Sequence, residues 1–188
     1  MSPTMNYFSS TLSMIATVFY VIGAIGYSDD DDVIKNVAWI TQEQGGGDGY
    51  YGLRQAYITG GGSSTSIKYK DCADANDTCE TCEDNGKGAF ALCIIGAVVA
   101  LLTMFTCGTL SRSVSFPLQL TSILLAAGAC IAGLIAISLF MGDCYDKVDD
   151  NGADLEWGPG SVLTIIAMFM MAGVGIVQIL STFICKST

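Results

Sequence analysis

Long apolar runs alternate with polar loops along the chain. Four runs contain no Asp, Glu, Lys or Arg, and they cover residues 7–27, 88–107, 116–141 and 160–185. Each has about 20 residues or more, the length that a helix needs to cross the apolar core of a bilayer. Soluble proteins rarely bury four such helices. The pattern therefore predicts four transmembrane helices over these ranges.

The first run also has an alternative interpretation as a cleaved signal peptide. The stretch IGAIGYS at its end offers small residues for cleavage. However, MSPTMNYF contains no basic residue, and the apolar run is longer than a typical signal core. A transmembrane helix is therefore favoured, because removing this run would leave only three.

The first long loop, residues 28–87, has the pattern of a β-sheet. The segments VIKNVAWITQ (33–42), GYYGLRQAYIT (49–59) and SSTSIKYK (63–70) are rich in β-branched and aromatic residues, and glycine-rich turns separate them. Residues 49–59 alternate in character as a strand with two different faces would. We expect an antiparallel sheet of three or four strands, to which LEWG (155–158) could add an edge strand.

These elements define the expected fold class. It is a membrane all-α fold with an extracellular β part: a four-transmembrane-helix bundle plus a small antiparallel β-sheet domain from the first outer loop. The second outer loop covers residues 142–159, and the link between the second and third helices covers 108–115. The terminal segments are 1–6 and 186–188.

Composition and charge support a membrane protein and suggest its orientation. Only 14% of residues are charged, whereas a soluble domain has about 25%. Residues 28–87 and 142–159 hold all 18 acidic residues and six of the eight basic ones, which leaves Arg112 and Lys186 on the opposite side. This asymmetry favours termini in the cytosol and loops outside the cell or in an organelle lumen. The expected location is the plasma membrane or another membrane of the secretory pathway.

The stretch DCADANDTCETCEDNG, residues 71–86, gathers cysteines beside a glycosylation sequon. Asn76-Asp77-Thr78 lies where glycosylation enzymes could reach it, so Asn76 is a candidate glycan site. Four cysteines fall on the outer side, namely Cys72, Cys79, Cys82 and Cys144. Two disulfides are the favoured interpretation in an oxidising compartment. The sequence does not select a pairing, although we favour Cys144 joining the second loop to the first.

Other roles for the cysteines stay open but are less favoured. A four-cysteine zinc site would need four thiolates outside the cell, and the chain has no His. A redox-active Cys-x-x-Cys would have acidic neighbours that disfavour the thiolate. Cys107 and Cys185 end the second and fourth runs, at the expected cytosolic boundary, where S-palmitoylation takes place. An apolar filler role is equally compatible with both.

Catalytic and nucleic-acid-binding patterns are missing from the sequence. No ionisable residue lies in any predicted span, which argues against a self-contained transporter. We find no catalytic constellation and expect neither an enzyme nor a cofactor. The acidic outer side excludes nucleic acid as a partner. A weak calcium site remains conceivable among the acids of the second loop, which are Asp143, Asp146, Asp149 and Asp150.

The layout resembles the claudin superfamily, which includes claudins, peripheral myelin protein relatives, AMPA-receptor regulatory subunits and amastins. The family signature is a Trp, then Gly-Leu-Trp, then two cysteines in the first loop. Here Trp39 precedes Gly52 and Leu53, and cysteines follow further along. The chain departs from the signature where Arg54 replaces the second Trp and Tyr57 stands in place of the first cysteine.

The resemblance implies a function in association. Trp39, Gly52 and Leu53 would dock the sheet onto the bundle, and the chain would assemble laterally into strands or arrays in the bilayer. The alternatives are an accessory subunit of a larger channel, receptor or transporter, and a paracellular ion pore. Tyr and Arg are enriched at binding hot spots. Tyr50, Tyr51, Arg54 and Tyr57 are therefore candidate contact residues, although ordinary strand composition explains the tyrosines equally well.

Overall fold

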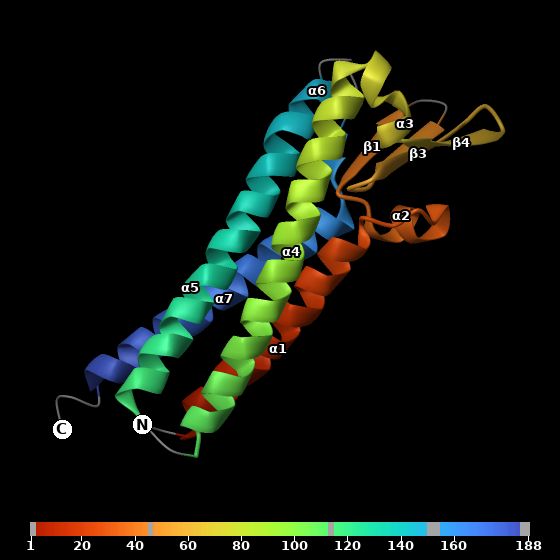
Figure 1. The fold of residues 1–188 in the computed structure, drawn as a ribbon. Helices are drawn as coiled ribbons and strands as arrows, with labels where there is room; N and C mark the ends of the chain where they lie inside the picture. The colour runs from red at the N-terminus through yellow and green to blue at the C-terminus, as the bar shows by residue number, and fades with distance from the viewer. Residues whose placement is uncertain (1–2, 45–46, 113–114, 150–154, 185–188) are drawn as a thin grey trace.

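Four long helices form a bundle in the computed structural model (Figure 1), which describes the chain except for residues 1–2, 45–46, 113–114, 150–154 and 185–188. They are α1 (Pro3–Ile25), α4 (Asp77–Leu110), α5 (Phe116–Leu139) and α7 (Pro159–Ile184). All four are long and apolar enough to cross a membrane. The predicted set of four apolar helices is therefore confirmed.

Small residues let these helices approach one another closely. The middle of the bundle is packed mainly with buried alanines, and Tyr20 is its largest fully buried side chain. The Tyr20 hydroxyl donates a hydrogen bond to the Ala129 carbonyl at 2.7 Å. Gly96 and Gly133 form the walls around its ring, where any Cβ atom would press against it. This is the close packing of small residues that membrane helices use.

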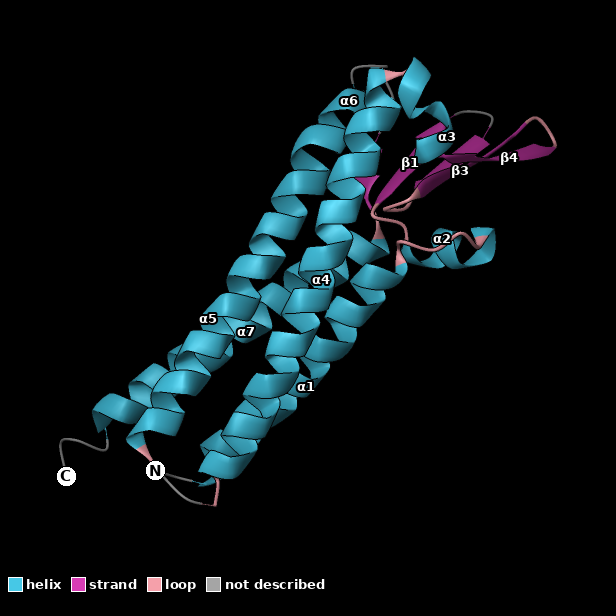
Figure 2. Ribbon diagram, viewed as in Figure 1, coloured by secondary structure: helices cyan, strands magenta, loops and turns pink. Residues whose placement is uncertain are grey.

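A five-stranded antiparallel sheet sits at one end of the bundle (Figures 1 and 2). The strand order is β4-β3-β2-β1-β5. The strands are β1 (Ile40–Gln44), β2 (Gly47–Tyr51), β3 (Gln55–Gly60), β4 (Ser63–Lys68) and β5 (Leu155–Trp157). The second loop thus supplies an edge strand, as LEWG suggested. We call this the sheet end; α1 begins and α7 ends at the opposite end, which we call the terminal end.

Two strand predictions need correction. Residues 33–37 are not extended but belong to the helix α2 (Asp31–Val37), because the Asp30 side chain accepts hydrogen bonds from the Asp32 and Val33 amides and starts a helix there. Residues 49–59 are not one strand. The Gly52 amide donates to the Gln55 carbonyl, and this turn divides the segment into β2 and β3.

The cysteine-rich stretch is helical rather than part of a sheet. It forms α3 (Tyr69–Cys72), the short 3-10 helix η1 (Ala73–Ala75) and the first turns of α4. Asn76 caps α4, since its side-chain oxygen accepts from the Thr78 amide at 2.9 Å. After α5, a π-helical turn, η2 (Phe140–Cys144), and α6 (Tyr145–Asp149) continue the helix alongside the first turns of α4 (Figure 1).

Candidate functional site: the sheet, its junction with the bundle and a basic cleft

Trp39 anchors the sheet in the top of the bundle. It is fully buried, and its indole N–H donates to the Gly23 carbonyl of α1 at 2.9 Å. A Cβ atom at Gly26 or Gly160 would lie 2.9 or 2.8 Å from the indole ring. The opposite contact is Phe140, edge-on with ring centroids 5.5 Å apart. The ring therefore fits a slot that only glycines leave open.

Gly52 and Leu53 form the second attachment point. The Leu53 amide donates to the Gly26 carbonyl at 2.7 Å, and its side chain is fully buried. On α4, a Cβ atom at Gly86 would collide with the Leu53 carbonyl. Gly26 thus contacts both Trp39 and Leu53. The three residues that the resemblance implicated all lie at the junction between sheet and bundle.

Two phenols, one buried and one half-buried, form hydrogen bonds near this junction. The Tyr69 hydroxyl donates to the Gly52 carbonyl at 3.1 Å, and the Tyr51 hydroxyl donates to the Gln42 side-chain oxygen at 2.6 Å. Burial raises the pKa of both tyrosines above the ordinary value, because a phenolate would lose its hydration there. Both phenols therefore stay protonated donors at neutral pH.

The four outer cysteines form two disulfides, Cys72–Cys79 and Cys82–Cys144. The first joins α3 to the start of α4. The second ties α4 to η2, and so joins the first loop to the second. It spans 62 residues, for which the chain-entropy model gives about 4 kcal/mol of stabilisation. Cys82 and Cys144 are both buried, which makes this pair a structural clamp.

The candidate contact residues divide into covered and exposed ones. Tyr57 is only 8% exposed, and the Lys35 ammonium of α2 lies 4.6 Å from its ring centroid. Tyr50 faces Tyr57 across the β2–β3 pair, and Tyr51 is half-buried. Arg54 is exposed and forms an ion pair with Asp29 at 3.0 Å. Tyr57 is therefore largely covered in this structure and Arg54 is exposed, and the contact roles of both stay predictions.

Several acidic residues have hydrogen-bond or ion-pair partners within the chain. Asp30 caps α2, Asp31 accepts from Gln55 and Ser66, and Asp32 pairs with Lys35. Asp143 accepts from Asn85 at 3.3 Å, and Asp146 is exposed. Within the described ranges, no group of three or more His, Cys, Asp or Glu could hold a metal ion. Asp149 ends α6, and Asp150 lies outside the described residues.

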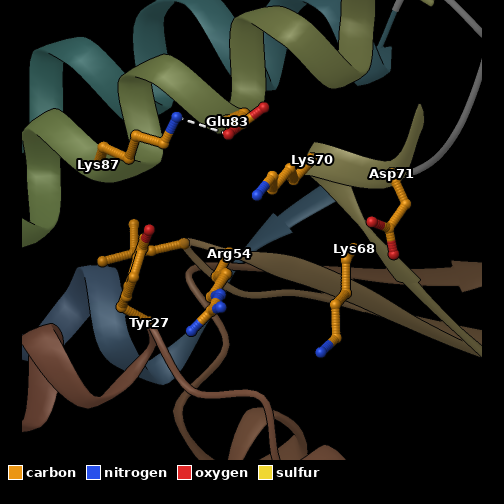
Figure 3. A pocket seen from close by; sticks show the side chains of 8 residues that line it. Tyr27, Arg54, Lys68, Lys70, Asp71, Glu83 and Lys87 are labelled. Carbon is orange, nitrogen blue, oxygen red and sulfur yellow. Dashed lines mark ion pairs between the residues drawn. The ribbon is translucent and has the colours of Figure 1, made fainter. Parts of the chain in front are cut away.

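Four basic residues from four separate segments gather in one cleft between the sheet and α4. The cleft has a volume of about 280 Å³ and is lined by Tyr27, Leu53, Arg54, Lys68, Lys70, Asp71, Glu83 and Lys87. Figure 3 shows the Lys70 and Lys87 side chains reaching into it from opposite walls. The hydrogen bond from Lys87 to Glu83 raises the pKa of Lys87, so its charge persists at neutral pH.

Comparison with known proteins leaves this geometry to be interpreted on its own. No family model matches the chain, and no curated protein matches it either.

The expected lipidation of Cys107 conflicts with its position. The thiol is fully buried and lies 3.1 Å from the Ser122 hydroxyl and 3.5 Å from the Gln178 side-chain nitrogen. An acyltransferase could not reach it without opening the bundle. The burial of Cys107 suits the alternative role of an apolar filler, its lipidation stays an untested prediction, and Cys185 lies outside the described residues.

Cys107 belongs to a polar network that sequence reasoning missed. Gln178 of α7 donates to the Asn6 side-chain oxygen of α1 at 3.3 Å, and Gln119 of α5 donates to the Gln178 carbonyl and the Ser181 hydroxyl, each at 3.1 Å. All four helices thus contribute to one buried network. The two glutamines were visible as polar residues within apolar runs. Asn6 was not, because it fell in the predicted tail, whereas α1 begins at Pro3.

Proposed function

We propose that this chain is a non-enzymatic, multi-pass membrane protein that assembles laterally with copies of itself through its sheet. The assemblies would be strands or arrays that organise a membrane or a cell contact, as the resemblance to claudins implies. The sheet end would face the exterior or a lumen, with both termini in the cytosol. Asn76 is exposed, which suits its role as a candidate glycan site.

The observation that carries this proposal is the open edge of the sheet. β4 is the outermost strand, and all six of its residues are exposed. Within the described part of the chain, β3 is the one strand that pairs with β4, so the other side of β4 presents backbone donors and acceptors that no strand pairs with. Proteins usually protect such an edge with prolines, inward charges or a covering element. β4 has no proline, and its one charge, Lys68, comes at its end.

The hairpin geometry suits pairing between copies. β3 and β4 project away from the bundle (Figure 1), and the turn between them contains Gly61 and Gly62, where an added Cβ atom would meet no other part of the protein within 4 Å. Two copies related by a two-fold axis could pair β4 with β4 and form one continuous sheet. Gly128 of α5 is exposed and would allow close helix contacts on another face. Two such interfaces together would extend a pair into an array.

A cysteine scan along β4 tests the pairing. In an antiparallel pair, Cα atoms of opposed residues lie about 4.5–5.5 Å apart, within the range of a disulfide. Single cysteines are introduced one at a time at each position from Ser63 to Lys68. The cysteine at the two-fold axis should cross-link two copies, because it lies opposite itself, and cysteines far from the axis should not. Glu156→Cys, on the other edge of the sheet, is the matched control and should stay uncross-linked.

Native sizing with mass spectrometry of the extracted protein separates the alternatives. A ladder of assemblies that contain this chain alone supports self-assembly. The ladder should disappear when proline replaces the β4 residues at which cysteines cross-link. A fixed ratio to one larger channel, receptor or transporter would instead make the chain an accessory subunit. Cross-linking through Glu156→Cys rather than β4 would place the interface on the wrong edge and refute the proposed pairing.

A further inference from the structure

The basic cleft concentrates positive charge in an acidic protein. The chain has a formal net charge of −10 and eight basic residues. Half of those eight, Arg54, Lys68, Lys70 and Lys87, line this one cavity. They come from the β2–β3 turn, the end of β4, α3 and α4, and the fold brings them together. Like charges that line one cavity repel one another, so they need compensating negative groups nearby.

Resident acids compensate three of the four cations. Asp29 pairs with Arg54 at 3.0 Å and with Lys68 at 3.4 Å. Glu83 and Asp84 both pair with Lys87. Lys70 forms no ion pair with any described residue, and its ammonium points into the cleft (Figure 3). Asp71 also lines the cleft but forms no ion pair with any of the four cations, so Lys70 is the cation left for an external anion.

Tyr69, the residue before Lys70, holds this wall of the cleft in place. Tyr69 is buried; its amide donates to the Arg54 carbonyl at 3.2 Å and its hydroxyl to the Gly52 carbonyl. On the other side, the Arg54 guanidinium lies 5.4 Å from the centroid of the Tyr27 ring, which stacks on Phe90. The cations therefore stand on a fixed framework, and binding would cost little reorganisation.

The height of the cleft along the bundle points to the source of the anion. Tyr27 follows two residues after α1 ends, and Lys87 comes directly before the apolar run that starts at residue 88. The cleft therefore lies at the level where the apolar parts of α1 and α4 end. In a bilayer, this is the level of the lipid headgroups, where basic pockets bind phosphates.

We propose that the cleft binds a phosphate group, carried by a lipid headgroup or by a free phosphate ester, with Lys70 as the main charge partner. Arg54 and Lys87 flank the site and limit its size. A cavity of about 280 Å³ suits a phosphate with its nearest substituents rather than a large ligand. The proposal is independent of self-assembly, because the cleft lies within one copy of the chain.

Lipid binding to the full-length protein tests the proposal. The protein is purified in mild detergent, and phosphatidic acid is titrated while bound lipids are counted by native mass spectrometry, with phosphatidylcholine as the reference lipid. Lys70→Gln should weaken phosphatidic acid binding about tenfold, as expected for a lost hydrogen bond to a charged group. The variant should fold normally. The Lys70 ammonium forms no ion pair with a described residue, so its removal leaves no described acid without its partner.

Lys35→Gln is the matched control, because it removes the same charge from α2, outside the cleft. Equal losses in Lys35→Gln and Lys70→Gln would mean general attraction and overturn the site, as would unchanged binding in Lys70→Gln.

A second arm identifies the source. Inorganic phosphate, compared with chloride at equal ionic strength, should raise the melting temperature in a Lys70-dependent way if free phosphate suffices. Lys70-dependent binding of phosphatidic acid alone assigns the site to a headgroup. The absence of a Lys70 effect in both arms refutes the proposal.

Discussion

The two ends of the bundle are held together in different ways. At the sheet end, the fully buried ring of Trp39 fills a slot between glycines, and the Cys82–Cys144 disulfide bridges α4 and η2. At the terminal end, amides and hydroxyls from α1, α5 and α7 form one network around Gln178, and α4 joins it through the thiol of the free Cys107.

This difference follows the position of the polar groups. At the sheet end, the polar sheet and loops meet solvent, and shape and covalent bonds hold them to the bundle. At the terminal end, the Gln119 and Gln178 side chains are buried between apolar helices, where an amide finds no other partner and hydrogen bonds between helices persist. The lesson is that one bundle can hold its sheet end by packing and disulfides and its terminal end by buried polar groups.

The largest effect is expected from removing the anchor at the sheet end. Trp39→Ala should lower the free energy of unfolding by about 3–5 kcal/mol, because it empties a glycine-lined slot that no neighbouring side chain can fill. Denaturant titration of the purified protein would measure this loss. Trp157→Ala is the control: Trp157 is 51% exposed, and its removal should change little. Equal losses in both variants would contradict the anchoring role.

The disulfides give a smaller effect that depends on loop length. Replacing Cys82 and Cys144 by alanine should cost about 4 kcal/mol in the chain-entropy model, whereas replacing Cys72 and Cys79 should cost about 2 kcal/mol. The reason is the sequence separation, which is 62 for the first pair and 7 for the second. Unfolding of both double variants under matched conditions checks the order. A larger loss for the Cys72–Cys79 pair would reverse this ranking.

The terminal end should be less sensitive to a single change. Gln178→Leu removes the donor to Asn6 and should cost about 1 kcal/mol, the usual scale for one hydrogen-bonded side chain between membrane helices. Thr121→Leu, at an exposed position of α5, serves as the control and should be neutral. A loss as large as that of Trp39→Ala would remove the contrast between the two ends.

The smallest effect on stability is expected from a rise in pH. It should be absent near neutral pH and should appear only in alkali. The pKa values of Tyr51 and Tyr69 are raised by burial, so their contribution to stability is complete below pH 10, the ordinary tyrosine value, and is lost as the pH rises through the raised values. Absorbance of the phenolates should appear together with loosening of the sheet. In Tyr51→Phe, the phenolate absorbance that appears at high pH should be smaller, and the sheet should not loosen at a lower pH than in the unchanged protein. Loosening at a lower pH would contradict the stabilising role of the protonated tyrosines.

The sequence was most informative where one physical signal dominates. Apolar length located the four helices, and LEWG joined the sheet as the edge strand β5. Local signals failed where two elements compete. The segment that begins at Val33 looked like a strand, but Asp30 caps a helix there. The turn at Gly52 was hidden because its reason lies elsewhere, in the Gly26 carbonyl that receives the Leu53 amide.

The sites were harder to predict than the fold. Arg54, Lys70 and Lys87 are far apart in the sequence, and only the docking of the sheet against α4 brings them into one cleft. Cys107 looked accessible because it ends an apolar run, yet α4 continues to Leu110 and buries it. Trp39, Gly52 and Leu53 could be singled out through the family resemblance, but their partners Gly23, Gly26 and Gly86 could not.

The slot for Trp39 has a consequence for how the protein is made. One of its walls is Gly160, and the Trp39 carbonyl accepts hydrogen bonds from the Gly158 amide and the Ser161 hydroxyl. These residues leave the ribosome more than a hundred positions after Trp39 itself. During synthesis the indole must therefore wait, undocked, until the fourth apolar segment has been inserted. Closure of this slot reports that every segment is in place, and an exposed Trp39 is the mark of an unfinished chain.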